Sequence, residues 1–209
     1  MFHQDGSNKG IMCVDCPCSY STITQPSQHT NSTMEVSANL LHGRSGSECQ
    51  KWLLEMRDAH ALLSAAISIM HPEMYALGRE SLIKQWKWAS KTEHGQVLDI
   101  LQLWPSVYNT ASLMVNRCSP YHVDINGQAE WYDQLLTVGQ YKGLDMVFPC
   151  QKLRLQYEAG SMIAFSGWLL VHGAGEVAGD RACLAWYMQH KVHSAFELPD
   201  CKFVTLQKV

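Results

Sequence analysis

The chain has 209 residues, of which 46% are hydrophobic and 17% charged, which suits one folded domain with a sizeable core and excludes a second full domain. Sixteen Lys and Arg against nineteen Asp and Glu give a net charge of −3. This excludes a protein that holds polyanions by overall positive charge, so any nucleic-acid contact must be local. The N-terminus lacks a signal-peptide core, and the most apolar stretch, 62–70, is too short to span a bilayer. We expect an intracellular protein without membrane contact, and no protein partner is evident.

Residues 1–40 are rich in Ser, Thr, Gln, Asn and Gly and have little hydrophobic periodicity. Such a segment cannot bury much surface by itself. We expect a polar N-terminal segment, followed by one domain over residues 41–209. Within the polar segment, Cys13, Cys16 and Cys18 form a C-x-x-C-x-C cluster. A zinc site needs four ligands and the chain has no second C-x-x-C, so the cluster is either a structural zinc site or a loop with free thiols.

Apolar residues recur at three- and four-residue intervals in the first half of the chain, which is the spacing of amphipathic helices. A capping-box pattern and a later His-Pro pair bound the first expected helix, over 45–70. Two further helices are expected over 73–89 and 93–103, the last closed by a Trp-Pro pair. These helices form the supporting part of the domain, 45–104.

The second half changes to short segments bounded by Gly or Pro, which indicates strands. The expected strands are 111–117, 135–139, 153–157, 162–165 and 182–188. Helices followed by a run of short strands predict an α+β fold. We expect a β core over 105–195, a sandwich or barrel, with the N-terminal helices packed on one face.

One group of residues in the strand-rich half has the spacing of a metal site. His122 and Asp124 lie two residues apart, so in an extended segment both side chains leave the same face. His172, at the end of a later apolar run, is a third candidate ligand. Two histidines and one carboxylate form the facial triad of non-haem Fe(II) oxygenases, which leaves positions open for a co-substrate and dioxygen. Arg181, at the start of the next expected strand, can hold the distal carboxylate of a 2-oxo acid.

A His-x-Asp pair alone arises easily by chance, and the ordered set of four residues is what carries the prediction. Three segments around this set are Leu113-Met-Val-Asn-Arg-Cys-Ser-Pro-Tyr-His-Val-Asp124, Leu153-Arg-Leu-Gln-Tyr-Glu-Ala-Gly-Ser-Met-Ile-Ala-Phe165 and His172-Gly-Ala-Gly-Glu-Val-Ala-Gly-Asp-Arg181. With them the sequence resembles the Fe(II)- and 2-oxoglutarate-dependent dioxygenases. More narrowly, it resembles the TET/JBP-like group, in the small form found in mushrooms. The resemblance covers residues 100–193.

The resemblance implies a double-stranded β-helix core of the jelly-roll or cupin-like type. It also implies oxidation of methyl groups on nucleobases in DNA, with 5-methylcytosine converted to 5-hydroxymethylcytosine and beyond. Carried over residue by residue, His122, Asp124 and His172 would bind Fe(II) and form the catalytic centre. Arg181 would hold the distal carboxylate of 2-oxoglutarate, and Arg117 matches a family arginine near its other end. Dioxygen is the second co-substrate, methylated DNA the expected partner, and the nucleus the expected location.

Recognition of the substrate is a separate expectation. To reach a base in a duplex, an enzyme must flip it into a pocket with stacking and hydrogen-bonding groups. His190, just beyond the last expected strand, could read the flipped base, with Gln189 and Asn126 as rivals. Each could equally be a solvated polar residue. On an N-methyl group the same chemistry releases formaldehyde, so N6-methyladenine is a second candidate substrate.

Aromatic and basic residues elsewhere admit two interpretations. The second expected helix interleaves Arg79, Lys84, Lys87 and Lys91 with Trp86 and Trp88. It is either a phosphate-contacting helix or an ordinary helix whose tryptophans face the core while its lysines are solvated. Trp168 and Trp186 lie in strand-like runs, so we expect them in the core.

Two alternatives to a DNA oxygenase stay open. A 2-oxoglutarate oxygenase of the same fold could act on RNA, protein or a small molecule, because fold and iron site do not fix the substrate. A binding module could keep the barrel and lose turnover, although the intact set of ligands and arginine opposes this.

Overall fold

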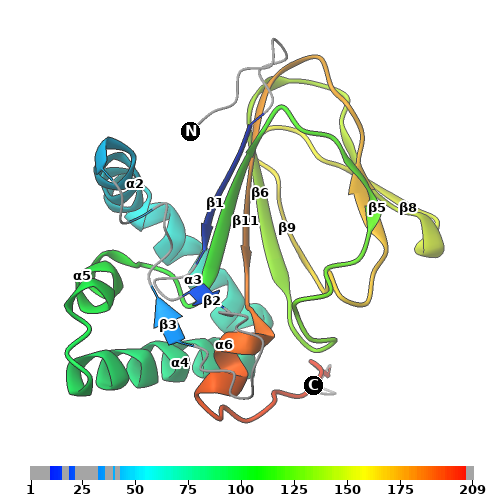
Figure 1. The fold of residues 1–209 in the computed structure, drawn as a ribbon. Helices are drawn as coiled ribbons and strands as arrows, with labels where there is room; N and C mark the ends of the chain where they lie inside the picture. The colour runs from blue at the N-terminus through cyan, green and yellow to red at the C-terminus, as the bar shows by residue number, and fades with distance from the viewer. Residues whose placement is uncertain (1–9, 16–18, 22–32, 36–39, 41–42, 206–209) are drawn as a thin grey trace, which may run out of the picture. The chain divides into compact units, whose positions relative to one another are not determined.

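The computed structural model describes residues 10–15, 19–21, 33–35, 40 and 43–205. They divide into two compact units, each described by itself below (Figure 1). The first unit is built on Ala111–Met188. The second is built on the helices that precede Thr110, together with Gln189–Asp200. Most of the polar segment 1–40 lies outside the described residues.

The larger of the two sheets in the first unit is centred on two long strands. Its order is β1-β4-β11-β6-β9. The strands, in that order, are Gly10–Asp15, Thr110–Val115, Gly179–Tyr187, Asp133–Tyr141 and Met162–Phe165. β11 runs antiparallel to β6 from the pair Gly179–Tyr141 to the pair Trp186–Gln134. β11 is thus the central strand of the sheet, and β6 lies between it and β9.

The second sheet carries the shorter strands, in the order β5-β10-β7-β8. Their bounds are Ser119–His122, His172–Ala174, Asp145–Phe148 and Leu153–Gln156, with the 3₁₀ turn η1 at Pro149–Gln151 between β7 and β8. β10 runs antiparallel to both of its neighbours, although it follows β5 and β7 only after long intervening segments. Two sheets joined by such crossovers form a jelly roll.

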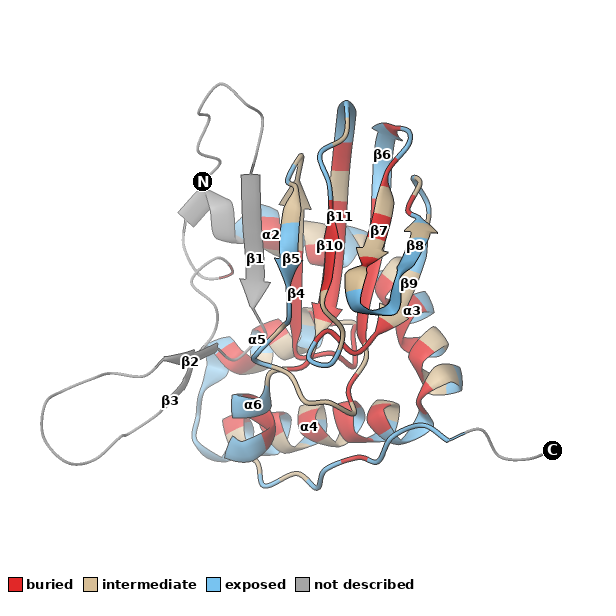
Figure 2. Cartoon of the chain, turned by 90° about the vertical axis from the view of Figure 1, so that its right-hand side faces the viewer, coloured by how far each residue is buried: buried red, intermediate tan, exposed pale blue. Residues whose placement is uncertain are grey.

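Side chains from both sheets fill the core of the first unit. Because successive side chains of a strand point to opposite faces and Ala185 pairs with Leu135, Leu135 and Tyr141 of β6 lie on the same face of the sheet as Cys183 and Ala185 of β11. These four pack with Leu144, Met146, Phe148, Tyr157, Phe165 and Ala174. Figure 2 shows the burial along β10 and β11. Two further positions on this face of β6, Asp133 and Thr137, are polar and point to the site described below.

The second unit is helical. Its helices are α2 (Gly43–Glu55), α3 (Arg57–Met70), α4 (Pro72–Lys91), α5 (Gly95–Leu103) and the short α6 (His190–Ala195). The hairpin of β2 (Ser19–Ser21) and β3 (Thr33–Glu35) also belongs to it. His71 caps α4 by accepting the Met74 N–H at 3.3 Å, and Pro72 occupies the first turn, where no donor is needed. None of the helices within the described residues combines the length and apolar character needed to cross a bilayer.

The structure confirms the predicted α+β class and corrects several elements. The single helix expected over 45–70 is divided at Met56, where φ is −85° and ψ is 0°. The sequence around Met56 contains neither Pro nor Gly, so the pattern gives no sign of the break. The segment 190–195, expected within the β core, is helix α6. Strands β5, β7 and β10 are not among the expected strands: β10 has only three residues, and β5 contains Pro120, which speaks against a strand.

Candidate active site

Strands β5 and β10 bring two histidines together. His122 is the last residue of β5 and His172 the first of β10, and the two are direct partners in the antiparallel pairing. Their ring centroids are 4.3 Å apart. A one-residue slip would turn the His172 side chain to the other face of the sheet. The register between two strands that are distant in sequence therefore creates this pair.

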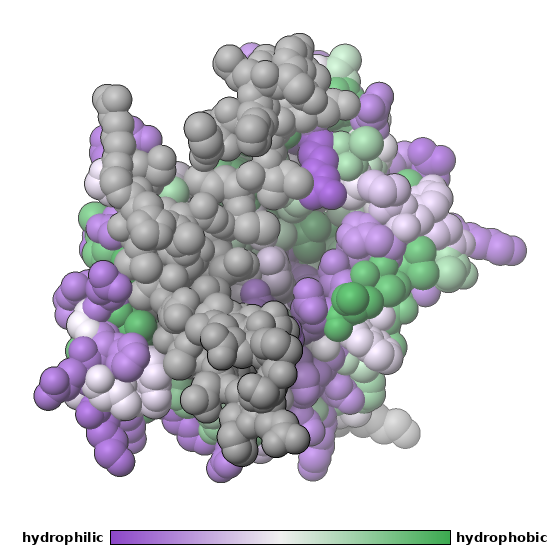
Figure 3. All heavy atoms as spheres, viewed as in Figure 1, coloured by the Kyte–Doolittle hydropathy of each residue, from purple (hydrophilic) through white to green (hydrophobic). Residues whose placement is uncertain are grey.

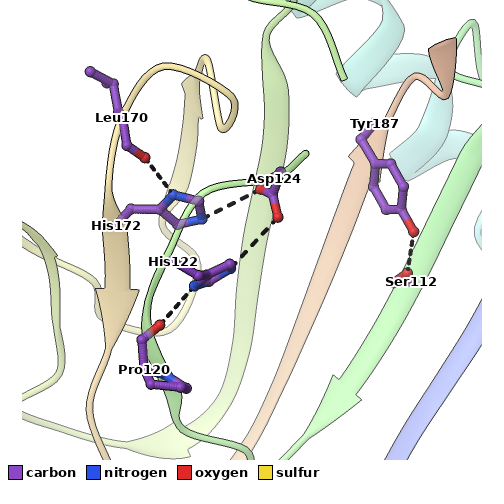
Figure 4. A network of polar contacts seen from close by, with 7 residues as sticks. All are labelled: Ser112, Pro120, His122, Asp124, Leu170, His172 and Tyr187. Atoms are coloured by element: carbon purple, nitrogen blue, oxygen red, sulfur yellow. Dashed lines mark hydrogen bonds and ion pairs between the residues drawn. The ribbon is translucent and has the colours of Figure 1, made fainter. Parts of the chain in front are cut away.

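Asp124 follows β5 and completes a three-residue cluster (Figure 4). Its Oδ1 lies 3.6 Å from His122 Nε2, and its Oδ2 lies 3.5 Å from His172 Nε2. Its backbone N–H donates to Gly167 O at 2.9 Å, which ties the loop after β5 to the turn before β10. One ligand atom from each residue lies within 4.8 Å of the other two. This spacing suits three ligands of a single metal ion.

Backbone carbonyls orient both imidazoles. His122 Nδ1 lies 2.7 Å from Pro120 O, and His172 Nδ1 lies 2.8 Å from Leu170 O. A carbonyl only accepts, so each Nδ1 carries the hydrogen and each Nε2 presents its lone pair toward Asp124. Burial lowers the pKa of His172, and the neighbouring His122 acts in the same direction. Metal ligation requires neutral imidazoles, and two of them with one carboxylate fit Fe(II).

A second carboxylate lies directly beside the cluster. Asp133, the first residue of β6, is buried. Burial raises the pKa of Asp133 well above its usual value, and the negative charge of Asp124 raises it further, while the N–H of Gly167 donates to the carboxylate and opposes the shift. Asp133 and Asp124 thus approach the same glycine.

Arg181, on β11, is buried and held by groups from three other segments. Its Nε donates to Thr137 Oγ1 on β6 at 3.1 Å, and its Nη1 donates to Arg117 O at 3.1 Å. Its guanidinium lies over the Tyr157 ring, 5.3 Å from the centroid. Within the described residues, no acidic side chain forms an ion pair with it. A buried cation held only by neutral groups favours an anionic ligand.

A further layer of hydroxyl groups supports this arrangement. Thr137 Oγ1 is 2.6 Å from the Tyr141 hydroxyl, which donates to Tyr157 O at 2.9 Å. The Tyr157 hydroxyl lies 3.5 Å from Cys183 Sγ, inside the core. We call Arg181, Thr137, Tyr141 and Tyr157 the arginine network. A buried guanidinium held in this way can pair with a carboxylate.

The sequence comparisons agree with this geometry. Residues 28–190 match the family model Tet_JBP, described as the oxygenase domain of the 2OGFeDO superfamily, the dioxygenases that depend on 2-oxoglutarate and Fe(II). The chain belongs to the Tet_JBP family. The match includes the helices α2 to α5, in which the sequence shows no recognisable family motif, and it confirms the predicted enzyme class. Among curated proteins, none matches the chain significantly.

Two solved structures are similar to this Tet_JBP chain to different degrees. NgTET1, solved in complex with 5mC DNA, has a TM-score of 0.56 and 13% identity; the match covers 90% of this chain and 63% of NgTET1. Because the match covers 63% of NgTET1, this chain spans less than two thirds of its length. At 13% identity the likeness shows the fold alone. A Cupin 2 conserved barrel domain protein from Salinispora arenicola has a TM-score of 0.27 and 14% identity, with 42% of this chain and 69% of that chain covered, which is too weak to support an argument.

The metal side of this Tet_JBP site is partly exposed. The His122 and Asp124 side chains are 42% and 47% exposed, whereas the His172 side chain is packed edge-on against Phe165. Next to the cluster, Ile125 is 78% and Trp168 is 47% exposed. Figure 3 shows strongly hydrophobic side chains at the surface on the right of the view, where Figure 1 draws β5 and β8.

Because Trp168 is exposed, the expectation that it lies in the core is wrong. The same expectation is right for Trp186, which is fully buried.

The other predicted site residues lie in different surroundings. Arg117 is exposed, and its backbone carbonyl, not its side chain, contacts Arg181. Asn126 is exposed in the turn that follows Asp124. His190 and Gln189 belong to the second unit: His190 Nε2 lies 3.1 Å from Ser194 Oγ, and the Gln189 N–H donates to Asn109 Oδ1 at 2.8 Å. The roles of His190 and Gln189 in base recognition stay predictions.

The remaining sequence predictions have mixed outcomes. Cys16 and Cys18 lie outside the described residues, as does the side chain of Cys13, so the zinc prediction stays untested. In α4, Lys84 donates to Phe196 O at 3.0 Å and pairs with Glu80 at 3.4 Å. Trp86 of the same helix is 41% exposed, so it does not face the core as the ordinary-helix interpretation requires.

The sequence analysis missed the residues that support the ligands. Thr137, Tyr157 and Gly167 each contact a predicted site residue, and Asp133 accepts from Gly167 beside Asp124. One signal for the first two was present: Asp133 and Thr137 interrupt the apolar face of a strand with polar residues four positions apart, on the side that faces the core. Gly167 and Tyr157 carry no comparable signal.

Proposed function

We propose that this chain is a dioxygenase that oxidises methyl groups on DNA bases, using Fe(II), 2-oxoglutarate and dioxygen. The candidate substrates are 5-methylcytosine, oxidised to 5-hydroxymethylcytosine and beyond, and N6-methyladenine, which would lose its methyl group as formaldehyde. The observation that carries the proposal is the cluster of His122, Asp124 and His172, partly exposed, in the same unit as the buried Arg181. The fold shared with NgTET1, whose structure contains 5mC DNA, supports the choice of substrate.

The residues of the site divide the work between them. His122, Asp124 and His172 would hold Fe(II), and Arg181 would pair with the distal carboxylate of 2-oxoglutarate, while Arg117 would approach its other end. The bound iron supplies, with 2-oxoglutarate and dioxygen, an oxidant that removes hydrogen from a methyl group and returns a hydroxyl. Overall, one oxygen atom enters succinate and the other the hydroxymethyl group, and carbon dioxide leaves 2-oxoglutarate. The carbonyls of Pro120 and Leu170 fix the orientation of both imidazoles and the tautomer that carries the hydrogen on Nδ1, which leaves each Nε2 lone pair for the metal.

The exposed apolar residues beside the cluster support a base as substrate. Ile125 directly follows Asp124, and Trp168 directly follows Gly167, whose carbonyl accepts the Asp124 N–H. An extruded base needs stacking partners, and the gap that it leaves in the duplex is commonly filled by apolar side chains. Asn126, exposed in the same turn as Ile125, is proposed as a hydrogen-bonding contact to the base. His190 and Gln189 are proposed as further base contacts on the strength of the sequence alone.

The proposal is tested by nucleoside mass spectrometry after incubation of the chain with Fe(II), 2-oxoglutarate and duplex DNA carrying both 5-methylcytosine and N6-methyladenine. We expect oxidised cytosine, loss of methyladenine, or both, with equimolar succinate, and no change with the His122→Ala variant. Succinate without any altered base would exclude DNA and direct the search to RNA, protein or small molecules. No succinate in any condition, with metal still bound, would identify a binding module.

A nuclear location, proposed because the substrate is DNA, is tested by microscopy of the tagged chain.

A further inference from the structure

The turn of residues 166–170 contacts two of the three candidate iron ligands. Gly167 O accepts the Asp124 N–H at 2.9 Å, and Leu170 O accepts from His172 Nδ1 at 2.8 Å. The turn is closed by the Leu170 N–H, which donates to Ser166 O at 3.0 Å. Displacing this turn would therefore disturb Asp124 and His172 together.

Asp133 holds the turn from the strand side. It begins β6, is 8% exposed, and is the backbone partner of Phe165, the last residue of β9. Its carboxylate accepts the N–H of Gly167. The same glycine thus donates to Asp133 through its N–H and accepts from Asp124 through its carbonyl. Asp133 is neither one of the three candidate iron ligands nor one of the residues proposed to hold 2-oxoglutarate.

The absence of a side chain at position 167 is required by this arrangement. A Cβ atom there would collide with Asp133 Oδ2 and Asp124 Oδ2, and would lie 3.2 Å from Asp124 Cβ. Both carboxylates are therefore packed against the Gly167 backbone. A substitution at this position could be accommodated only by moving Asp124, Asp133 or the turn.

We propose that Asp133 is a positioning residue for the metal centre: through its hydrogen bond to Gly167 it fixes the turn that orients Asp124 and His172. The inference rests on the proposed function of that centre and adds a fourth residue to it. Residues that orient metal ligands in this way typically contribute about 10- to 100-fold to metal affinity. The volume of the Asp133 side chain is secondary, because the turn needs a hydrogen-bond acceptor at this place.

The test compares two variants of similar size. Asp133→Leu removes the acceptor, and Asp133→Asn keeps an oxygen that can accept from the Gly167 N–H. The first readout is the dissociation constant of Mn(II), measured by electron paramagnetic resonance of the free ion. The second is turnover, given as kcat and the KM for 2-oxoglutarate. We expect Asp133→Leu to bind Mn(II) about 10- to 100-fold more weakly, and Asp133→Asn to stay within about threefold of the original chain.

Control variants separate positioning from general stability. Glu158→Leu removes another carboxylate that accepts a glycine N–H, from Gly143 at 2.9 Å, outside the metal cluster, and it should leave Mn(II) affinity unchanged. Gly167→Ala should weaken Mn(II) binding as Asp133→Leu does. If Asp133→Leu does not fold, Gly167→Ala replaces it in the comparison with Asp133→Asn. Circular dichroism establishes folding for every variant.

The outcomes distinguish this inference from the proposed function. Equal Mn(II) affinity in Asp133→Leu and the original chain would overturn the positioning role and leave the metal centre standing. Loss of affinity in Asp133→Asn as large as that in Asp133→Leu would also overturn it, because the charge and not the hydrogen bond would then be responsible. Failure of the original chain to bind Mn(II) would contradict the metal centre itself.

Discussion

The metal cluster and the arginine network belong to one β unit but differ in their surroundings. At the metal cluster, His122 and Asp124 are nearly half exposed, and apolar residues beside them reach solvent. In the arginine network, Arg181 is 6% exposed and is held by a hydroxyl, a carbonyl and an aromatic ring. The small co-substrate, which is the same for every turnover, would thus meet a rigid and enclosed site. The variable substrate would meet an open one.

This contrast predicts which changes affect chemistry, co-substrate and DNA separately. Residues of the cluster should control all turnover. Residues of the arginine network should control the requirement for 2-oxoglutarate, and the exposed rim should control DNA alone. An effect of a substitution on a property assigned to another of these regions would contradict this division.

The largest effect is expected from His122→Ala. Removing one of three ligands should abolish iron binding and reduce turnover to background, because the remaining two residues cannot define the facial site. Iron content and succinate formation measure this, with circular dichroism to show that the fold is kept. Retained turnover would exclude His122 as a ligand.

The next largest effect is expected from Arg181→Ala. Loss of the buried guanidinium should raise the KM for 2-oxoglutarate by about 100-fold, in the range for truncating one partner of a buried charged contact. Iron should still bind. Arg181→Lys should recover part of the loss, because a lysine restores the charge without the two-pronged geometry. If Arg181→Ala changed the affinity for iron and left the KM for 2-oxoglutarate unchanged, the two regions would not be separate in function.

A smaller effect is expected from Trp168→Ala. If the exposed ring stacks on DNA, affinity for methylated duplex should fall about tenfold, since stacking of a base on an aromatic ring contributes about 1–3 kcal/mol. The KM for 2-oxoglutarate should not change. Trp86→Ala, which removes a comparably exposed tryptophan from α4, is the matched control and should change DNA affinity less than twofold. The reverse result would place the DNA contact on the basic helix.

The smallest effect concerns stability in the helical unit, which serves as a reference outside both regions. Burial lowers the pKa of His60 to about 4, from 6.5. The unfolded chain therefore binds this proton at a higher pH than the folded chain does, so stability falls as the pH drops through the window from about 6.5 to 4. Between pH 7.5 and 6 the loss from His60 should be about 1 kcal/mol.

Urea unfolding at the two pH values measures this loss. His60→Phe keeps an aromatic ring between Trp52 and Trp104 and should reduce the pH dependence by that amount. An unchanged slope would show that His60 does not titrate differently in the folded chain. The experiment also defines the pH range in which variants of the site can be compared without unfolding.

The candidate ligands could be predicted from the sequence, whereas the contacts that support them could not. His122 and Asp124 are two residues apart, so strand geometry alone suggests that they act together. The partnership of His122 with His172 depends on the register of β5 and β10, two strands that are distant in sequence. The contacts of Asp133 with Gly167, and of Arg181 with Thr137 and Tyr157, arise where separate strands meet. Such contacts depend on three-dimensional packing, which a single sequence does not encode locally.

The most direct test of the whole account is an anaerobic titration of the Fe(II)-loaded chain with 2-oxoglutarate, followed by the visible charge-transfer absorption that chelation of iron by a 2-oxo acid produces. The account predicts one iron per chain and a saturable absorption band, absent in His122→Ala and shifted to much higher 2-oxoglutarate concentration in Arg181→Ala. A band of equal strength and midpoint in all three proteins would contradict the assignment of both regions.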